Sequence, residues 1–238
     1  MEFYVQRAQD IEQEIVLPRT YSKTRFGIAP LLPANVESVL EIGCGTGGTM
    51  SWLRSIRSVA YAAAVEISSA DGAMAMNSFD DVEIGDIASV PMNFRTAHFD
   101  LILALDVLEH LTNAEKTLAI LYDRLKPGGT IIISLPNVAH YHVACPLMFK
   151  GEWEYADEGP LDRTHLRFFT ESTARRMIEQ CGLTIRQVQY TCIYPNVFAM
   201  FGLRSRQWRW YSHRLLQHIL IWPARLFRYQ FVFAATRP

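Results

Sequence analysis

A largely apolar run that ends in a glycine-rich turn constrains this chain most strongly. Residues 36–42 have the β-branched and aliphatic character of a buried strand, and Gly43, Gly45 and Gly47 follow directly. Glycine tolerates left-handed backbone and lets a ligand approach the main chain closely. A helix is expected next, over residues 47–57. A strand, a glycine turn and a helix in this order favour an α/β ligand-binding fold.

Strand and helix signals alternate along the rest of the chain. Further strands are expected at residues 59–67, 82–84, 99–105, 130–135, 183–194 and 230–236, and further helices at residues 70–77, 113–125 and 170–181. The near-continuous apolar character of residues 99–105 is typical of a strand that helices cover on both faces. The rhythm predicts an α/β doubly wound sheet with right-handed crossovers.

Three segments depart from this rhythm. Residues 1–34 are expected to form an N-terminal helix, around residues 10–17, and a lid segment that precedes the main domain over residues 35–238. Residues 138–169 are irregular and rich in His, Trp, Tyr and acidic residues, so this long connection is predicted to contribute to a substrate site. Residues 195–229 form an aromatic and arginine-rich insert between the last two strands.

Three acidic residues follow or precede the turn at places where a carboxylate can meet a ligand. Glu41 lies two residues before the first glycine, where it can contact an ammonium group. Glu66 ends the second predicted strand, where it can accept two ribose hydroxyls, and Asp86 follows the third, within reach of an adenine amino group. The turn also satisfies the dinucleotide spacing G-x-G-x-x-G. A dinucleotide site explains Glu66, but not Glu41 together with Asp86.

Several motifs in a fixed order resemble class I S-adenosylmethionine-dependent methyltransferases. Besides the turn they are V-E-I at 65–67, G-D-I at 85–87, F-D-L-I at 99–102, D-V-L-E-H-L at 106–111 and L-K-P-G-G at 125–129. The resemblance is close over residues 35–135. It implies a doubly wound, Rossmann-like sheet of seven mostly parallel strands with an antiparallel last strand.

The resemblance implies that S-adenosylmethionine is the cofactor and leaves as S-adenosylhomocysteine. Glu41 and the glycine turn would hold the methionine part, Glu66 the ribose and Asp86 the adenine, and Leu105 and Asp106 would lie beside the methyl group. The predicted cofactor residues are Glu41, Gly43, Cys44, Gly45, Gly47, Glu66, Ile67, Asp86, Ile87, Leu105 and Asp106.

Histidines are the candidate bases for a hydroxyl acceptor, because imidazole titrates near neutral pH. His110 follows the fourth strand and is near the methyl group by topology, although it could instead only order its loop. His140 and His142 follow the fifth strand and are expected on the substrate side. Together with Glu109 and His110 they could also bind a metal, but a solvated loop is favoured and no metal is predicted.

The segment 159–170, G-P-L-D-R-T-H-L-R-F-F-T, resembles one in bacterial polysaccharide and O-antigen methyltransferases, and it also occurs in broader ubiquinone-type methyltransferase relatives. We expect His165 to be the base, with Asp162 to orient it. Arg163 and Arg167 could clamp a polyhydroxyl or anionic substrate. Alternatively, Asp162 and Arg167 form an internal salt bridge. Upstream, Trp153 and Tyr155 suit stacking on a sugar face, or are ordinary packed aromatics.

Charge is unevenly distributed along the chain. The net charge of −1 combines −9 over residues 1–179 with +8 over residues 180–238, which contain eight arginines and no acid. On a helix, residues 205–228 would place arginine on one face and Trp and Leu on the other. This pattern favours an anionic membrane surface, with packing on the domain or in a homodimer as alternatives. Nucleic acid is not expected as a partner.

The expected cellular location of the protein follows from three sequence features that are absent. The four cysteines are scattered, the N-terminus lacks a signal-peptide pattern, and no apolar window is long enough to span a membrane. We therefore expect a cytoplasmic protein, peripheral on the inner face of the membrane if the insert binds lipid. The expected function is O-methylation of a sugar or a lipid-linked glycan. Methylation of another small molecule, such as a quinone precursor or natural product, and a non-catalytic cofactor-binding scaffold are the alternatives.

Overall fold

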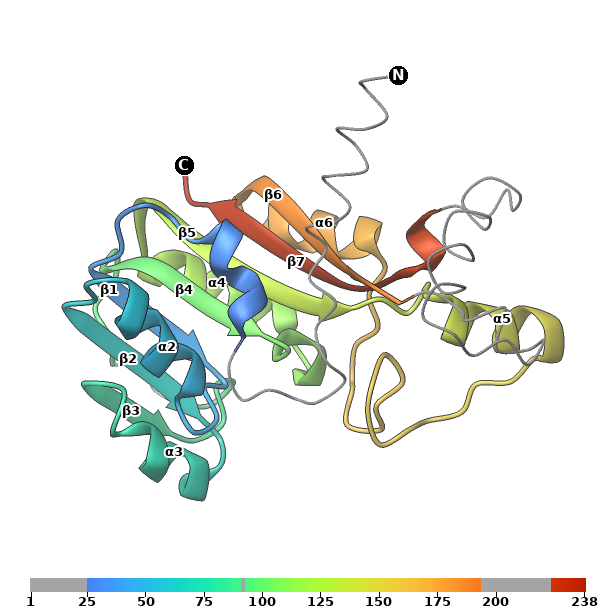
Figure 1. The fold of residues 1–238 in the computed structure, drawn as a ribbon, viewed down its shortest axis with the longest axis horizontal. Coiled ribbons are helices and arrows are strands. Elements are labelled where there is room, and N and C mark those ends of the chain that lie inside the picture. Colours follow the sequence, from blue (N-terminus) through green and yellow to red (C-terminus); the bar gives the residue numbers. More distant parts are fainter. Residues whose placement is uncertain (1–24, 91–92, 194–223) are drawn as a thin grey trace, which may run out of the picture.

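The computed structural model describes residues 25–90, 93–193 and 224–238 (Figure 1). Seven strands and their helices follow one another along the chain. They are η1 (Phe26–Leu31), β1 (Ser38–Ile42), α2 (Gly48–Ile56), β2 (Tyr61–Glu66), α3 (Ser69–Ala75), β3 (Asp81–Ile84), β4 (Phe99–Leu105), η2 (Leu108–His110), α4 (Ala114–Arg124), β5 (Leu125–Pro136), α5 (Tyr141–Lys150), α6 (Glu171–Gln180), β6 (Thr184–Cys192), η4 (Ala224–Leu226) and β7 (Arg228–Thr236).

The strands form one sheet in the order β3-β2-β1-β4-β5-β7-β6. The first five are parallel, and β7 runs antiparallel to both β5 and β6. The chain leaves β1 toward β2 and β3, then returns to add β4 on the other side of β1. Ligands in open α/β sheets bind at such a switch point, beyond the carboxyl ends of the strands. The predicted seven-stranded, mostly parallel fold is confirmed.

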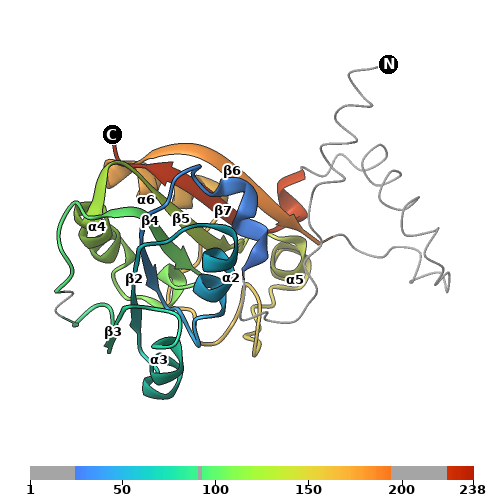
Figure 2. The same ribbon diagram turned by 60° about the vertical axis from the view of Figure 1, so that its left-hand side comes forward.

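Alternate residues of the central strands face two separate cores. Leu40, Ile102 and Ile131 pack with buried residues of α4 and α6, whereas Val39 and Leu101 pack with buried residues of η1 and α2. In Figure 2 the sheet lies between α4 on one side and α2 on the other. Burial on both faces explains why these strands read as continuous apolar runs.

Local signals place the helix starts. The Ser68 side chain accepts a hydrogen bond from Asp71 N–H at the start of α3, and Asn113 accepts one from Lys116 N–H at the start of α4. Thr170 forms a reciprocal capping box with Thr173 at the start of α6. These helices begin within a residue or two of the predicted positions.

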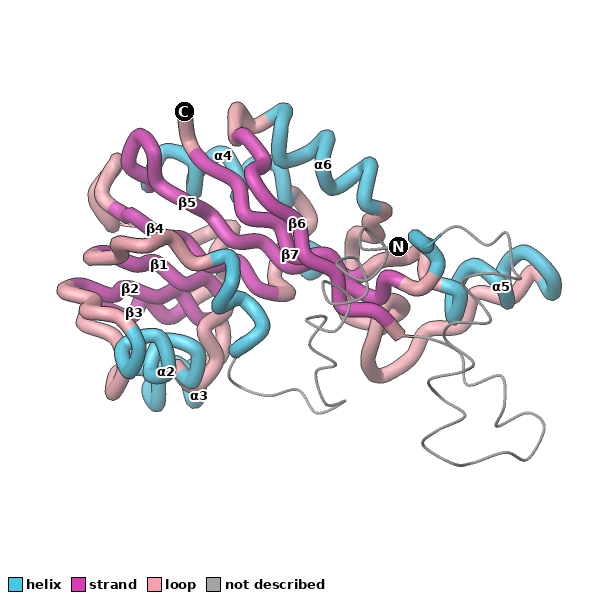
Figure 3. The backbone as a smooth tube through the Cα atoms, turned by 45° about the horizontal axis from the view of Figure 1, so that its top comes forward, coloured by secondary structure: helices cyan, strands magenta, loops and turns pink. Residues whose placement is uncertain are grey.

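The substrate segment 138–169 is more ordered than predicted. It contains the helix α5, which lies beyond the ends of β5 and β7 (Figure 3). The sequence pattern did not predict this helix, because Pro146 lies inside it and its apolar residues form no stripe along one face. The predicted helix at residues 10–17 and most of the insert 195–229 lie outside the described residues. Within the described part of the chain, no helix has the length and apolar character needed to cross a bilayer.

Candidate functional site

The glycine turn after β1 adopts the backbone that the sequence requires. Gly43, Gly45 and Gly47 have φ values of 65°, 54° and 82°, which L-residues with side chains rarely adopt. A Cβ on Gly43 would also lie 2.5 Å from Cγ2 of Val107. Gly43 N–H donates to the carbonyl of Val65 on β2 at 2.8 Å. The turn is therefore fixed against the carboxyl ends of β1, β2 and β4.

Glu66, the last residue of β2, is buried and holds two loops together. One carboxylate oxygen accepts a hydrogen bond from Gly45 N–H at 2.7 Å, and the other accepts one from Ser68 N–H at 2.9 Å. These bonds aim the side chain at the glycine turn. A carboxylate oxygen with two lone pairs can still accept from a ligand hydroxyl.

Glu41 lies within β1 and is almost fully buried. Its Oε2 atom has no hydrogen-bond partner among the residues that the structure describes. Burial raises the pKa of Glu41 to about 8; Arg25 acts against this rise, and the nearby Glu66 carboxylate adds to it. Burying a carboxyl oxygen without a hydrogen-bond partner costs free energy of folding, so this carboxyl suits a cationic ligand group.

The other predicted cofactor residues occupy the same edge of the sheet with different exposure. Cys44 is buried, and burial raises the pKa of its thiol to about 12, so the thiol stays neutral. Ile67 is 72% exposed, whereas Ile87 is buried. The Asp86 carboxylate accepts a hydrogen bond from Ala88 N–H at 2.9 Å. Leu105 is buried at the end of β4.

Asp106 follows β4 in a left-handed conformation, with φ of 57°. Its Oδ1 accepts hydrogen bonds from Ser134 of β5 and Gln230 of β7, and its Oδ2 forms an ion pair with Arg25 at 2.8 Å. Three strands and the segment before η1 thus meet at this carboxylate. Sequence reasoning placed Asp106 here but missed Arg25, which is distant in the chain and carries no motif.

His110 and His165 come from segments 55 residues apart and lie against each other, with ring centroids 4.7 Å apart. Nδ1 of His165 lies 3.3 Å from the carbonyl oxygen of Pro160. Nδ1 of His110 lies 3.3 Å from the carbonyl oxygen of Thr164. A carbonyl only accepts, so Nδ1 is the donor in each ring, and in a neutral imidazole of this tautomer Nε2 has the lone pair. His165 is buried, and burial lowers its pKa.

Glu109 completes this cluster; the sequence suggested it only as a possible metal ligand together with His110, His140 and His142. It is 1% exposed, and its Oε2 has no hydrogen-bond partner in the described part of the chain. Burial raises its pKa well above the usual value, and the Asp106 carboxylate adds to the effect. Its backbone carbonyl accepts hydrogen bonds from the N–H groups of Leu166 and Arg167.

His140 is not on an open substrate surface, contrary to the sequence expectation. Its side chain is fully buried, and its Nε2 lies 3.2 Å from the carbonyl oxygen of Ile193. Burial lowers the pKa of His140 to about 4, so the ring is neutral at physiological pH. Its Nδ1 accepts a hydrogen bond from His142 N–H at 3.4 Å and caps α5. Its side chain therefore has no surface open to solvent and packs within the segment 138–169.

The charged residues of the segment 159–170 pair differently from both sequence readings. The Asp162 carboxylate accepts hydrogen bonds from the N–H and hydroxyl of Thr164, and only its backbone carbonyl bonds His165. Arg167 does not pair with Asp162. Instead it donates to the Thr112 carbonyl and pairs with Glu115 at the start of α4, which anchors the segment to the domain.

The remaining predicted substrate residues lie on the surface. Arg163 pairs with Asp157 at 2.9 Å, and both side chains are mostly exposed. Trp153 is 36% exposed and Tyr155 is 51% exposed, and both rings pack against Phe168. Both side chains are therefore partly exposed, on the same segment as His165.

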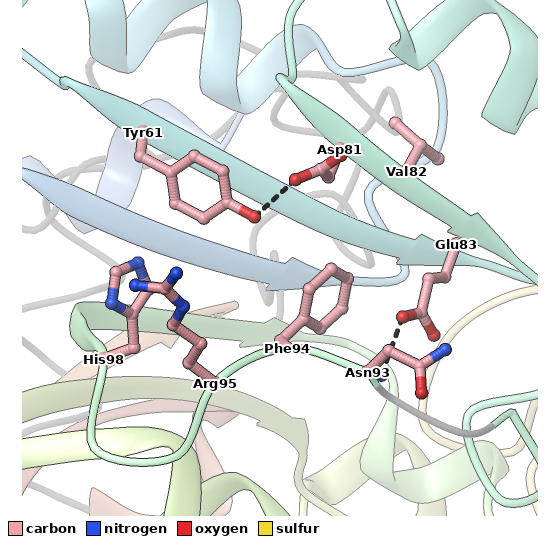
Figure 4. A pocket seen from close by; sticks show the side chains of 8 residues that line it. All are labelled: Tyr61, Asp81, Val82, Glu83, Asn93, Phe94, Arg95 and His98. Atoms are coloured by element: carbon pink, nitrogen blue, oxygen red, sulfur yellow. Dashed lines mark hydrogen bonds between the residues drawn. The ribbon is translucent and has the colours of Figure 1, made fainter.

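A hollow at the opposite edge of the sheet is a separate feature (Figure 4). It is lined by Tyr61, Asp81, Val82, Glu83, Asn93, Phe94, Arg95 and His98. Tyr61 and Asp81 begin β2 and β3, so the hollow lies at the amino ends of these strands. The Tyr61 hydroxyl donates to Asp81 at 2.6 Å. The hollow contains none of the predicted site residues.

Comparison with known proteins identifies the protein family of the chain. A family model described as a methyltransferase domain matches residues 19–188, more than half of the chain. The chain belongs to this methyltransferase family. The match includes the glycine turn, all three candidate cofactor acids and the Glu109–His110–His165 cluster. The sequence prediction of a methyltransferase enzyme is confirmed.

Solved structures share the fold of this methyltransferase at low sequence identity. An S-adenosylmethionine-dependent methyltransferase from Mesorhizobium loti is 15% identical with a TM-score of 0.59, covering 91% of this chain and 99% of the other. One from Archaeoglobus fulgidus is 17% identical with a TM-score of 0.58, covering 87% and 89%. Both neighbours are S-adenosylmethionine-dependent, which agrees with the cofactor that the sequence predicts for this methyltransferase family.

One curated relative gives no further detail about the methyltransferase. It is an uncharacterized protein of Synechococcus sp., 30% identical over 106 residues. The match covers 40% of this chain but only 24% of the relative. The chain thus spans about a quarter of the length of the curated relative that it matches.

Proposed function

We propose that the protein transfers the methyl group of S-adenosylmethionine to a hydroxyl oxygen of a sugar or a lipid-linked glycan. The observation that carries this proposal is the contact between His110 and His165 beside Asp106, at the carboxyl end of β4. A hydroxyl acceptor must lose a proton as it is methylated, whereas a neutral amine can attack with its own lone pair. Two imidazoles with free Nε2 lone pairs suit the hydroxyl.

The cofactor is assigned to the edge that the glycine turn and Glu66 form. In our proposal Glu41 meets the ammonium group of the methionine part, Glu66 accepts the ribose hydroxyls, and Asp86 meets the adenine. The unpartnered, buried Oε2 of Glu41 supports the first assignment. Leu105 and Asp106 then lie next to the methyl group, on the side of the two imidazoles.

The transfer is an in-line displacement. The acceptor oxygen forms a bond to the methyl carbon while the carbon–sulfur bond breaks and its electron pair moves to sulfur, which becomes neutral. The hydroxyl proton passes to Nε2 of His165. The protein contributes alignment of oxygen, carbon and sulfur, and a group that takes the proton.

The segment 138–169 is assigned to acceptor binding. Trp153 and Tyr155 are partly exposed on this segment, and aromatic faces suit the apolar side of a sugar. The buried base lies at the other end of the same segment. Residues 159–170 resemble both polysaccharide and ubiquinone-type methyltransferases, so the carbohydrate assignment rests on the aromatic rings and the quinone precursor stays the alternative. Membrane association or dimerisation through residues 205–228 also remains a proposal, supported only by the sequence pattern.

A screen with methyl-labelled S-adenosylmethionine tests the acceptor. We expect label in free or lipid-linked sugars, and the labelled product should be a methyl ether stable to mild base. A quinone precursor labelled in place of every sugar would contradict the carbohydrate assignment. Cofactor binding without label in any acceptor would favour the scaffold alternative.

Glu41 makes cofactor binding a proton-releasing event. With a pKa of about 8 the free carboxyl is mostly protonated at pH 7. An ammonium group beside it favours the carboxylate, so binding should release about one proton at pH 7. Calorimetric titration in two buffers of different ionisation enthalpy measures this number. Glu41→Gln should abolish the release; equal release by variant and wild type would refute the assignment.

A further inference from the structure

Three potential metal ligands lie close together at the site, and one carboxylate oxygen among them has no hydrogen-bond partner within the described residues. Glu109, His110 and His165 each offer a ligand atom, and the three atoms lie within 4.8 Å of one another. This set differs from the combination with His140 and His142 that the sequence suggested. His140 is buried against Ile193 and does not belong to the cluster.

The Glu109 carboxyl is the strongest sign of a missing partner. It is 1% exposed, and its Oε2 lacks a hydrogen-bond donor within the described residues. Arg167, whose backbone N–H bonds the Glu109 carbonyl, pairs through its side chain with Glu115. Asp106, which adds negative charge nearby, is committed to Ser134, Gln230 and Arg25. A cation at the cluster would satisfy Glu109 where the protein itself does not.

The two imidazoles are oriented as metal ligands usually are. Each donates its Nδ1 proton to a backbone carbonyl, His165 to Pro160 and His110 to Thr164. This outer hydrogen bond fixes the tautomer and leaves Nε2 as the ligand atom. The hydroxyl of Thr164 also lies 3.2 Å from Nδ1 of His110 and donates its own proton to Asp162.

The backbone holds the ligands in place without an ion. Glu109 and His110 belong to η2, which follows β4, and His165 belongs to the substrate segment. The Glu109 carbonyl accepts hydrogen bonds from the N–H groups of Leu166 and Arg167 at 2.9 and 3.0 Å. Two segments distant in sequence are thereby fixed to each other directly beside the ligands, so the site is preorganised.

We propose that Glu109, His110 and His165 bind one divalent first-row metal ion, of the Zn²⁺ or Co²⁺ type. Two imidazole nitrogens and one carboxylate oxygen are ligands that such ions accept. Three protein ligands leave at least one coordination position open, as in catalytic rather than structural sites.

The role of the ion rests on the proposed function, whereas its binding does not. The acceptor hydroxyl would occupy the open position, where the ion lowers the pKa of that hydroxyl. Its proton then leaves to water, the oxygen bonds to the methyl carbon, and the electron pair of the broken carbon–sulfur bond stays on sulfur. With the ion bound, His165 holds the metal instead of taking the proton.

The test titrates the untagged full chain, stripped with a chelator, with Co²⁺ and then Zn²⁺. We expect one equivalent of Co²⁺ per chain with visible ligand-field absorption, displaced by one equivalent of Zn²⁺. Glu109→Gln and His165→Asn should each weaken binding about 100-fold. His98→Asn, at the opposite edge of the sheet, is the matched control and should bind like the wild type.

Folding and function are monitored in the same samples. Glu109→Gln keeps the side-chain shape, so its melting temperature without metal should equal or exceed that of the wild type. At one equivalent, Zn²⁺ should raise the melting temperatures of the wild type and of His98→Asn, and should raise those of Glu109→Gln and His165→Asn much less. No Co²⁺ or Zn²⁺ binding by a folded wild type that binds S-adenosylmethionine overturns the metal site alone. Metal binding without methylation of any acceptor supports the site and counts against the proposed function.

Discussion

His165→Asn is expected to lower turnover about 1000-fold and leave the affinity for S-adenosylmethionine within twofold of the wild type. Removing a positioned proton acceptor typically costs 10²- to 10⁴-fold. His165 lies on the substrate segment and contacts His110, not the glycine turn or Glu66. The loss should therefore fall on the chemical step and not on cofactor binding.

Asparagine is the informative replacement at this position. Its amide can still donate to the Pro160 carbonyl, which Nδ1 of His165 meets at 3.3 Å, so the buried carbonyl keeps a partner. Single-turnover rates and calorimetric affinities separate the two effects. His98→Asn should keep both values. Turnover of His165→Asn within threefold of the wild type would remove His165 from the reaction, as base and as metal ligand.

Glu66→Gln is expected to weaken binding of S-adenosylmethionine about 100-fold, or about 2.7 kcal/mol. The carboxylate accepts hydrogen bonds from Gly45 N–H and Ser68 N–H, and in our proposal from the ribose hydroxyls. An amide replaces one accepting oxygen by a donor, which then faces an N–H group. Hydrogen bonds to a charged group contribute about 1.5–3 kcal/mol each.

Calorimetric titration of the folded variant measures this loss, with circular dichroism to confirm that the sheet is intact. Glu37→Gln is the matched control, because Glu37 is exposed and precedes β1 at the opposite edge of the sheet. The control should bind with wild-type affinity. A folded Glu66→Gln protein that also did so would show that the ribose is held elsewhere.

The fold was largely predictable because its signals are local. Three kinds of signal act within a few residues. They are the apolar runs of strands buried on both faces, capping residues such as Thr170, and glycines with positive φ. The helix α5 was missed because Pro146 and an evenly apolar composition leave no periodic stripe. A helix of this kind is stabilised by contacts with neighbouring elements, and a local sequence pattern does not reveal those contacts.

The candidate site was predictable only where a motif marks it. The order of Glu41, the glycine turn and Glu66 predicted that these residues meet at one edge of the sheet, and the structure brings them together there. The pairings of Arg25 with Asp106 and of Arg167 with Glu115 join residues 81 and 52 positions apart, and nothing in the sequence selects these partners from other charges. The same holds for the approach of His165 to His110, which the tertiary fold alone creates.

The central claim is that this edge of the sheet binds S-adenosylmethionine for methyl transfer, and a calorimetric titration of the full chain tests it most directly. The account predicts one site per chain, with a dissociation constant of roughly 1 μM to 1 mM, the range usual for enzyme substrates. It also predicts competition by S-adenosylhomocysteine, the product. Absence of binding at millimolar cofactor, by protein shown to be folded, would contradict it.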